Sequence, residues 1–192
     1  MKYRIRIAGR DHERLKGLLY PGDGLEAGAI ATCGRLEIDG LTVLLVHEVY
    51  EVPADAYLCR ESDLLDWNLE WMTDIINKAE SRNLSLLKFH SHPSGLRRFS
   101  PRDDASDTEI LKDWTNWYGR TTPHGSAVML PNGEVFARVQ SNGKQFVPVD
   151  TVSVAGDRYH NWASIRIDEE ERTAASERNV QAFGKGTVDK LR

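Results

Sequence analysis

The pattern of apolar and polar positions predicts regular elements along most of the chain. Residues 3–7 alternate as a strand with one buried face does, and residues 12–20 are predicted to form a short helix. Residues 36–52 indicate two strands around a turn at Asp39-Gly40, a dipeptide typical of tight hairpins. The first quarter of the chain is therefore expected to mix strands with a helix.

The pattern continues with a long helical repeat followed by strands. A helix is predicted from Ser62 to near Asn83, because these apolar residues follow helical spacing: Leu65, Leu69, Met72, Ile76 and Ala79. Residues 84–89 form a mostly apolar run that predicts a buried strand. Residues 126–139 predict a hairpin, and residues 147–154 fit one more strand, with an edge position as one reading. The pattern by itself indicates an α/β fold.

Two histidines and an aspartate follow the buried strand at a spacing that suits a metal ion. If the strand continues to His92, then His90 and His92 lie on the same face, because side chains two apart on a strand point the same way. Ser100-Pro101 is a favourable helix start, with Asp103 as the carboxylate of its first turn. That turn can bring Asp103 to the histidines as a third ligand.

Two histidines and one carboxylate leave the fourth position of a tetrahedral Zn²⁺ open for water, which is the pattern of a catalytic site. Asp104 and Asp107 are nearby alternatives to Asp103 as the third ligand. The loop between the histidines and the helix carries Arg97-Arg98, which fit either a grip on a substrate chain or a solvated loop.

A single carboxylate interrupts a run of small apolar residues at positions 25–34. This carboxylate, Glu26, needs an explanation, because a charge placed in such a run must be paired or functional. Glu48 and Glu51 are its rivals for a catalytic role, and both lie in a predicted strand. For these two, a solvated strand edge is the favoured interpretation.

One segment consists of His90-Ser91-His92-Pro93, six further residues, and then Ser100-x-x-Asp103. This segment resembles the signature of the JAMM (JAB/MPN) metallopeptidases. The resemblance implies that His90, His92 and Asp103 hold zinc. It also implies that Ser100 stabilises the tetrahedral intermediate and that Glu26 is the general acid/base. The implied fold is a central mixed β-sheet flanked by helices, similar to the cytidine-deaminase-like architecture. The implied reaction is hydrolysis of a peptide or isopeptide bond at the C-terminus of a ubiquitin-like protein.

The end of the chain differs in composition from the rest. We expect a metallopeptidase domain over residues 1–155 and a linker with a helix over 156–192, because the chain becomes charged and rich in alanine from Asp168. Residues 178–192 resemble the leading helix of a ThiF (ubiquitin-activating-enzyme-like) adenylation domain. The resemblance implies a bacterial type of JAMM protein whose partner is such a domain or protein.

Composition restricts the compartment and the partners. The 192 residues carry a formal charge of −4, which gives no electrostatic footprint for nucleic acid. The two cysteines form no CxxC motif, and no secretory signal or membrane-length apolar run is present, so a reduced cytoplasmic protein is expected.

Two other functions compete with the peptidase. The string His92–Gly95 (HPSG) also occurs in RadC-like proteins, which are associated with DNA repair, and salt-sensitive DNA binding would favour that branch. A metal-free MPN scaffold that acts only in protein assembly is the third reading.

Overall fold

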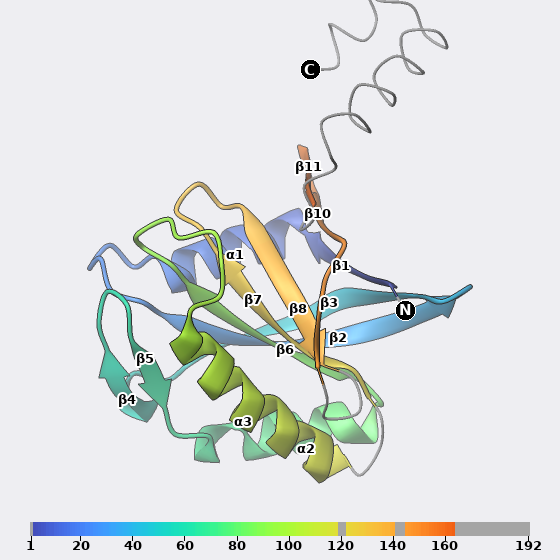
Figure 1. The fold of residues 1–192 in the computed structure, drawn as a ribbon, viewed down its shortest axis with the longest axis horizontal. Helices are drawn as coiled ribbons and strands as arrows, with labels where there is room; N and C mark the ends of the chain where they lie inside the picture. Colours follow the sequence, from blue (N-terminus) through green and yellow to red (C-terminus); the bar gives the residue numbers. More distant parts are fainter. Residues whose placement is uncertain (1, 119–121, 141–144, 164–192) are drawn as a thin grey trace, which may run out of the picture.

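The structure, a computed structural model, describes residues 2–118, 122–140 and 145–163 (Figure 1). Three α-helices are formed in this part of the chain: α1 (Gly9–Leu19), α2 (Thr73–Ser81) and α3 (Pro101–Tyr118). The strands are β1 (Lys2–Ala8), β2 (Gly28–Ile38), β3 (Leu41–Glu51), β4 (Tyr57–Arg60), β5 (Leu65–Trp67), β6 (Ser85–Ser91), β7 (His124–Met129), β8 (Val135–Gln140), β9 (Phe146–Pro148), β10 (Thr151–Ala155) and β11 (Tyr159–Ala163). Short 3₁₀ turns, η1 (Ala54–Ala56) and η2 (Glu70–Met72), complete the set.

Nine of these strands form one mixed sheet in the order β11-β10-β1-β3-β2-β6-β7-β8-β9, and β4 and β5 form a separate hairpin. The pairs β1–β10, β1–β3 and β6–β7 are parallel, and the other neighbours in the sheet are antiparallel. The sheet curls on itself, because β8 also contacts β10. The expected α/β class with a central mixed sheet and flanking helices is confirmed at this level.

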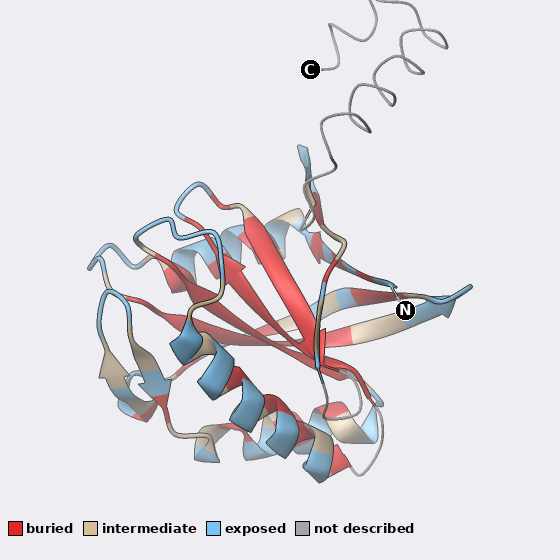
Figure 2. Ribbon diagram, viewed as in Figure 1, coloured by how far each residue is buried: buried red, intermediate tan, exposed pale blue. Residues whose placement is uncertain are grey.

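Helices cover the two faces of the sheet separately, with α1 on one side and α2 and α3 together on the other (Figure 1). The first core lies between α1 and the sheet. It combines the alternate residues Tyr3, Ile5 and Ile7 of β1 with Leu15 and Leu19 of α1. The second core packs residues of α2 and α3 on the sheet. Strands β6, β7 and β8 are buried along their whole length between these layers (Figure 2).

The locally encoded elements are where the sequence predicts them. The β2–β3 hairpin turns at Asp39 and Gly40, whose φ angles of 48° and 77° are the left-handed values that a tight hairpin turn requires. The predicted strand over 3–7, the helix over 12–20 and the hairpin over 126–139 correspond to β1, α1 and β7–β8. The alternation of β1, the periodicity of α1 and the β7–β8 turn are read from residues a few positions apart, although β1 pairs with the distant strands β3 and β10.

The predicted helix from Ser62 to Asn83 is wrong over its first half. Leu65 and Trp67 belong to β5, which pairs with β4, and the helix begins only at Thr73. The Trp67 ring occupies the space next to Gly28, where an added Cβ would lie 2.4 Å from the ring. This packing against a distant strand decides the local structure, and it outweighs the helical spacing of the apolar residues.

The single strand predicted over 147–154 is also wrong, because the segment forms two strands at different places in the sheet. β9 is the edge strand beside β8, whereas β10 lies between β11 and β1. The chain crosses between these positions where the Val149 N–H donates to the Ala137 carbonyl (2.9 Å) and the Asp150 N–H donates to the Tyr3 carbonyl (2.8 Å).

β11 pairs with β10, so the sheet continues past residue 155 to Ala163. The predicted linker and ThiF-like helix lie, from residue 164 onward, outside the described residues. Within the described part of the chain, no helix has the length and apolar character required to cross a membrane.

Candidate metal centre

Strand β6, near the centre of the sheet, carries His90 and leads directly into His92. β6 lies between β2 and β7, and His90 is in register with Gly28 on one side and Val128 on the other. His92 follows the strand, and its N–H donates to the Met129 carbonyl (3.1 Å), so the pairing with β7 continues past Ser91. Both imidazoles are buried.

The first turn of α3 fixes the third residue of the group through a reciprocal cap. The Asp103 N–H donates to Ser100 Oγ (3.1 Å), and the Ser100 N–H donates to Asp103 Oδ2 (2.6 Å). This is the capping-box arrangement, with aspartate in the place that glutamate or glutamine usually takes. The cap orients the Asp103 carboxylate and the Ser100 hydroxyl together.

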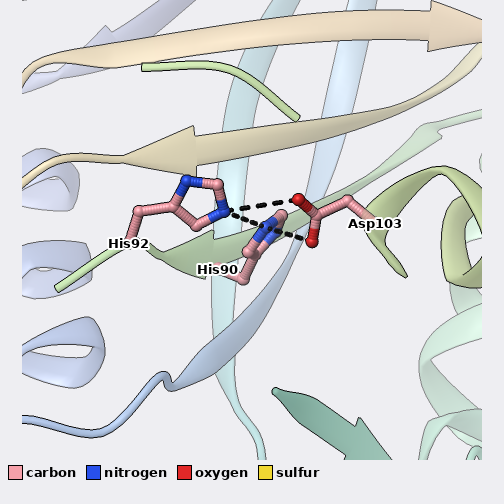
Figure 3. A group of neighbouring side chains, drawn as sticks. All are labelled: His90, His92 and Asp103. Atoms are coloured by element: carbon pink, nitrogen blue, oxygen red, sulfur yellow. Dashed lines mark hydrogen bonds and ion pairs between the residues drawn. The ribbon is translucent and has the colours of Figure 1, made fainter. Parts of the chain in front are cut away.

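His90, His92 and Asp103 come together as the sequence predicts (Figure 3). The two Nε2 atoms lie 3.1 Å apart, His90 Nε2 is 3.1 Å from Asp103 Oδ1, and His92 Nε2 is 3.4 Å from Asp103 Oδ2. One ligand atom from each residue lies within 4.8 Å of the others, so the group can hold a metal ion.

The protonation of the group fits a cation rather than a closed hydrogen-bond network. His92 Nδ1 lies 2.8 Å from the Leu96 carbonyl, which can only accept, so Nδ1 carries the proton and the Nε2 lone pair faces the group. Burial would raise the pKa of Asp103, but His90 and His92, when they carry a proton on Nε2, donate to its carboxylate and hold that pKa well below the usual range. The lone pairs and the carboxylate therefore converge on a place that favours positive charge.

Glu26 lies beside this group although it precedes β2. Its Oε1 is 4.0 Å from His92 Nε2, and only 6 % of the residue is exposed. The backbone is held on both sides: Glu26 N–H donates to the Glu61 carbonyl (2.8 Å), and Arg60 Nε donates to the Glu26 carbonyl (2.9 Å). Burial raises the pKa of Glu26 to about 7, against the lowering effect of His92.

The two rival glutamates lie elsewhere. Glu48 accepts a bond from Lys78 Nζ (2.7 Å) and another from the Tyr50 hydroxyl, and these bonds lower its pKa. Glu51 is exposed and lines a different cavity, of about 300 Å³, next to Gly28. In the described residues, neither joins the group of His90, His92 and Asp103.

Asp104 and Asp107, the alternative ligands, belong to an ion network behind the metal group. Asp107 is fully buried and accepts bonds from Lys88 Nζ (2.8 Å) and from Arg138 Nη2 (2.7 Å). The partly exposed Asp104 carboxylate pairs with Nη1 of the Arg138 guanidinium. The Arg138 guanidinium also lies 3.8 Å from the centre of the Phe99 ring.

A cleft of about 290 Å³ opens from the metal group between β5 and α3. Glu26, His90 and Asp103 line one part of it, and Trp67 and Ile110 line another. The sequence pattern did not predict the side of the cleft that β5 forms, because it placed Leu65 and Trp67 on a helix. It also assigned no role to Lys88, although a lysine inside an apolar strand two residues before His90 was a detectable signal.

The two arginines of the loop after His92 have different surroundings. Arg97 Nε donates to Glu134 Oε1 (2.6 Å), and Arg97 Nη2 donates to the Ala163 carbonyl (3.1 Å). Arg98 is exposed, and it makes no ion pair or hydrogen bond within the described residues. Arg97 is thus an anchor of the loop, whereas Arg98 faces solvent.

Comparison with known proteins adds no assignment: neither the models of protein families nor the curated proteins contain a match to this sequence.

Proposed function

We propose that this chain is a zinc metallopeptidase of the JAMM type, with the JAMM/MPN variant of the cytidine-deaminase-like architecture. The observation that carries the proposal is the convergence of a buried glutamate with a group of two histidines and one aspartate. Glu26 Oε1 lies 4.0 Å from His92 Nε2, on the border of the cleft that the metal group also lines. Three protein ligands with a nearby carboxylate are the composition of hydrolytic zinc sites.

His90, His92 and Asp103 would hold the ion, and the bond from Nδ1 to the Leu96 carbonyl keeps His92 in the ligating tautomer. When bound, zinc lowers the pKa of a water molecule to about 7 and polarises the carbonyl under attack.

Glu26 accepts the proton of the attacking water and delivers it to the leaving amine. In the metal-free chain burial raises the pKa of this carboxyl to about 7, and general acid–base catalysis is most efficient when the pKa is close to the working pH. We assign the stabilisation of the oxyanion to Ser100, on the resemblance of the motif and on its cap with Asp103. Its Oγ accepts the Asp103 N–H, and its own O–H has no acceptor within the described residues, so it is available to donate.

The substrate we propose is the C-terminus of a ubiquitin-like protein, joined through a peptide or isopeptide bond. The support for this substrate is the resemblance of the motif. A ThiF-like activating domain or protein is the proposed partner on the same ground.

The first experiment measures zinc per chain by elemental analysis in the parent, in His92→Ala and in His47→Ala. His47 is an exposed histidine of β3 outside the metal group, so its replacement is the matched control. About one zinc is expected in the parent and the control, and none in His92→Ala. Fusions of ubiquitin-like proteins are then tested for cleavage with and without a chelator.

A parent chain that takes up no zinc, even after remetallation, would contradict the proposal. Zinc without cleavage of any ubiquitin-like fusion would retain the metal centre and refute the substrate.

A further inference from the structure

The loop between His92 and α3 carries the atom that orients one metal ligand, yet it is an exposed segment. Residues 94–98 are all exposed, and Leu96 within them supplies the carbonyl that accepts the bond from His92 Nδ1. Gly95 takes a left-handed φ of 76°, and its N–H donates to the His92 carbonyl (2.9 Å). This short turn places the Leu96 carbonyl, but the exposed segment has few contacts that would keep it there.

Arg97 supplies such a contact directly after Leu96. Its guanidinium donates to Glu134 Oε1 (2.6 Å) from Nε and to the Ala163 carbonyl (3.1 Å) from Nη2. Both partners belong to ordered elements: Glu134 lies in the β7–β8 turn, and Ala163 is the last residue of β11. The planar fork of arginine can hold two acceptors at fixed positions, which a lysine cannot do.

The acceptor Glu134 is itself held in place. Its carbonyl accepts the Leu130 N–H (2.8 Å), and its N–H donates to Asn132 Oδ1 (2.9 Å). Only 19 % of its side chain is exposed, whereas that of Arg97 is 45 % exposed. The ion pair therefore joins the half-exposed arginine of the loop to a turn that is held by its own hydrogen bonds.

We propose that Arg97 is a positioning residue, which holds the Leu96 carbonyl on His92 and so keeps His92 in the tautomer that can ligate a metal. This inference deepens the proposed function and rests on it. A neutral imidazole has one protonated nitrogen, so loss of the Leu96 acceptor lets the proton move to Nε2 and removes the lone pair from the metal group. Outer-shell partners of this kind are worth about 10- to 100-fold in metal affinity when they contact the ligand directly.

The test uses the full chain with Arg97→Ala, Arg97→Lys and, as the matched control, Arg98→Ala. Zinc affinity is measured by competition with a chelator. Because Arg97 acts through Leu96, we expect a loss at or below the lower end of that range, about 3- to 10-fold, for Arg97→Ala. We expect a smaller loss for Arg97→Lys and no change for Arg98→Ala.

A second readout needs no metal. The ring nitrogens of His92 are observed by ¹⁵N NMR in the metal-free chain at alkaline pH, where the ring is neutral. The parent and Arg98→Ala should show one tautomer, with the proton on Nδ1, and Arg97→Ala should show a mixture with the Nε2–H form. Glu134→Ala removes the acceptor of Arg97 from the other side and should reproduce the mixture, which also covers the case that Arg97→Ala does not fold.

Equal zinc affinities and equal tautomers in Arg97→Ala, Glu134→Ala and Arg98→Ala would overturn the inference. If the parent binds no zinc, the proposed function fails, and the tautomer comparison still decides the role of Arg97.

Discussion

Two clusters of buried polar groups lie side by side in this protein, and their charges are arranged in opposite ways. In the ion network, the Asp107 carboxylate accepts from Lys88 and Arg138, so every buried negative charge has a positive partner from the chain itself. In the metal group, His90, His92 and Asp103 turn lone pairs and a carboxylate toward one another, with no lysine or arginine among them.

The difference separates a structural cluster from a functional one. A balanced buried network is complete without a ligand, although its net contribution to stability is small after desolvation. A cluster of acceptors requires positive charge from outside the chain. In the metal-free chain, a proton on His92 supplies part of that positive charge. Burial lowers the pKa of His92, but the bonds to Asp103 and Leu96 outweigh this effect and raise it.

The largest expected effect sharpens the contrast at the metal group. Glu26→Gln should still bind about one zinc but lose about 10²- to 10⁴-fold in hydrolysis, because the amide cannot accept the proton of the attacking water. Zinc content and initial rates on a ubiquitin-like fusion are measured in the same preparation. Glu48→Gln is the control, since Glu48 pairs with Lys78 outside the group. Unchanged activity in Glu26→Gln would refute its assignment as the general acid/base.

The second prediction breaks the balance of the ion network. Asp107→Asn leaves Lys88 and Arg138 buried without their shared carboxylate, and we expect a loss of about 3 to 5 kcal/mol in the free energy of unfolding. The control is Asp104→Asn at the 58 % exposed side chain next to Arg138, which should cost no more than about 1 kcal/mol. Urea denaturation measures both variants. Similar losses in the two would mean that the buried network is not distinct from a surface ion pair.

The third prediction concerns Ser100, which serves both the helix cap and the proposed oxyanion site. Ser100→Ala removes an acceptor for the Asp103 N–H and an oxyanion donor, so we expect about 1 kcal/mol less stability and about a 100-fold lower rate. Ser100→Thr keeps the hydroxyl and should retain most of both. Rates and urea midpoints are compared at saturating zinc. A rate that falls only as far as the stability loss explains would assign Ser100 to the cap alone.

The smallest expected effect tests a buried histidine that lies in neither cluster. His124 Nδ1 accepts the Leu86 N–H (3.1 Å), and burial lowers its pKa to about 3. The folded chain binds this proton more weakly than the unfolded chain, so the stability that His124 supports is present above pH 6.5 and declines as the pH falls toward 3.

Between pH 6.5 and 4.5 the metal-free parent should therefore lose about 1 kcal/mol per pH unit relative to His124→Gln, which keeps an acceptor but does not titrate. Urea midpoints across this range measure the difference. Parallel pH profiles for the two chains would contradict the depressed pKa.

The sequence by itself determined the elements whose contacts are local. The Asp39-Gly40 turn, the alternation of β1 and the cap at Ser100 and Asp103 each involve residues a few positions apart, so the pattern was sufficient. The same holds for His90 and His92, because two residues separated by one position on a strand share a face whatever the fold.

Only the tertiary structure decided the features that depend on distant contacts. Glu26 reaches His92 because β2 lies beside β6, and the Lys88–Asp107–Arg138 network joins three elements. Trp67 is on a strand because its ring fills the space at Gly28, against the helical spacing of its own segment. The physical reason is common to these cases: pairing and packing across the chain outweigh local preferences of a fraction of a kcal/mol per residue.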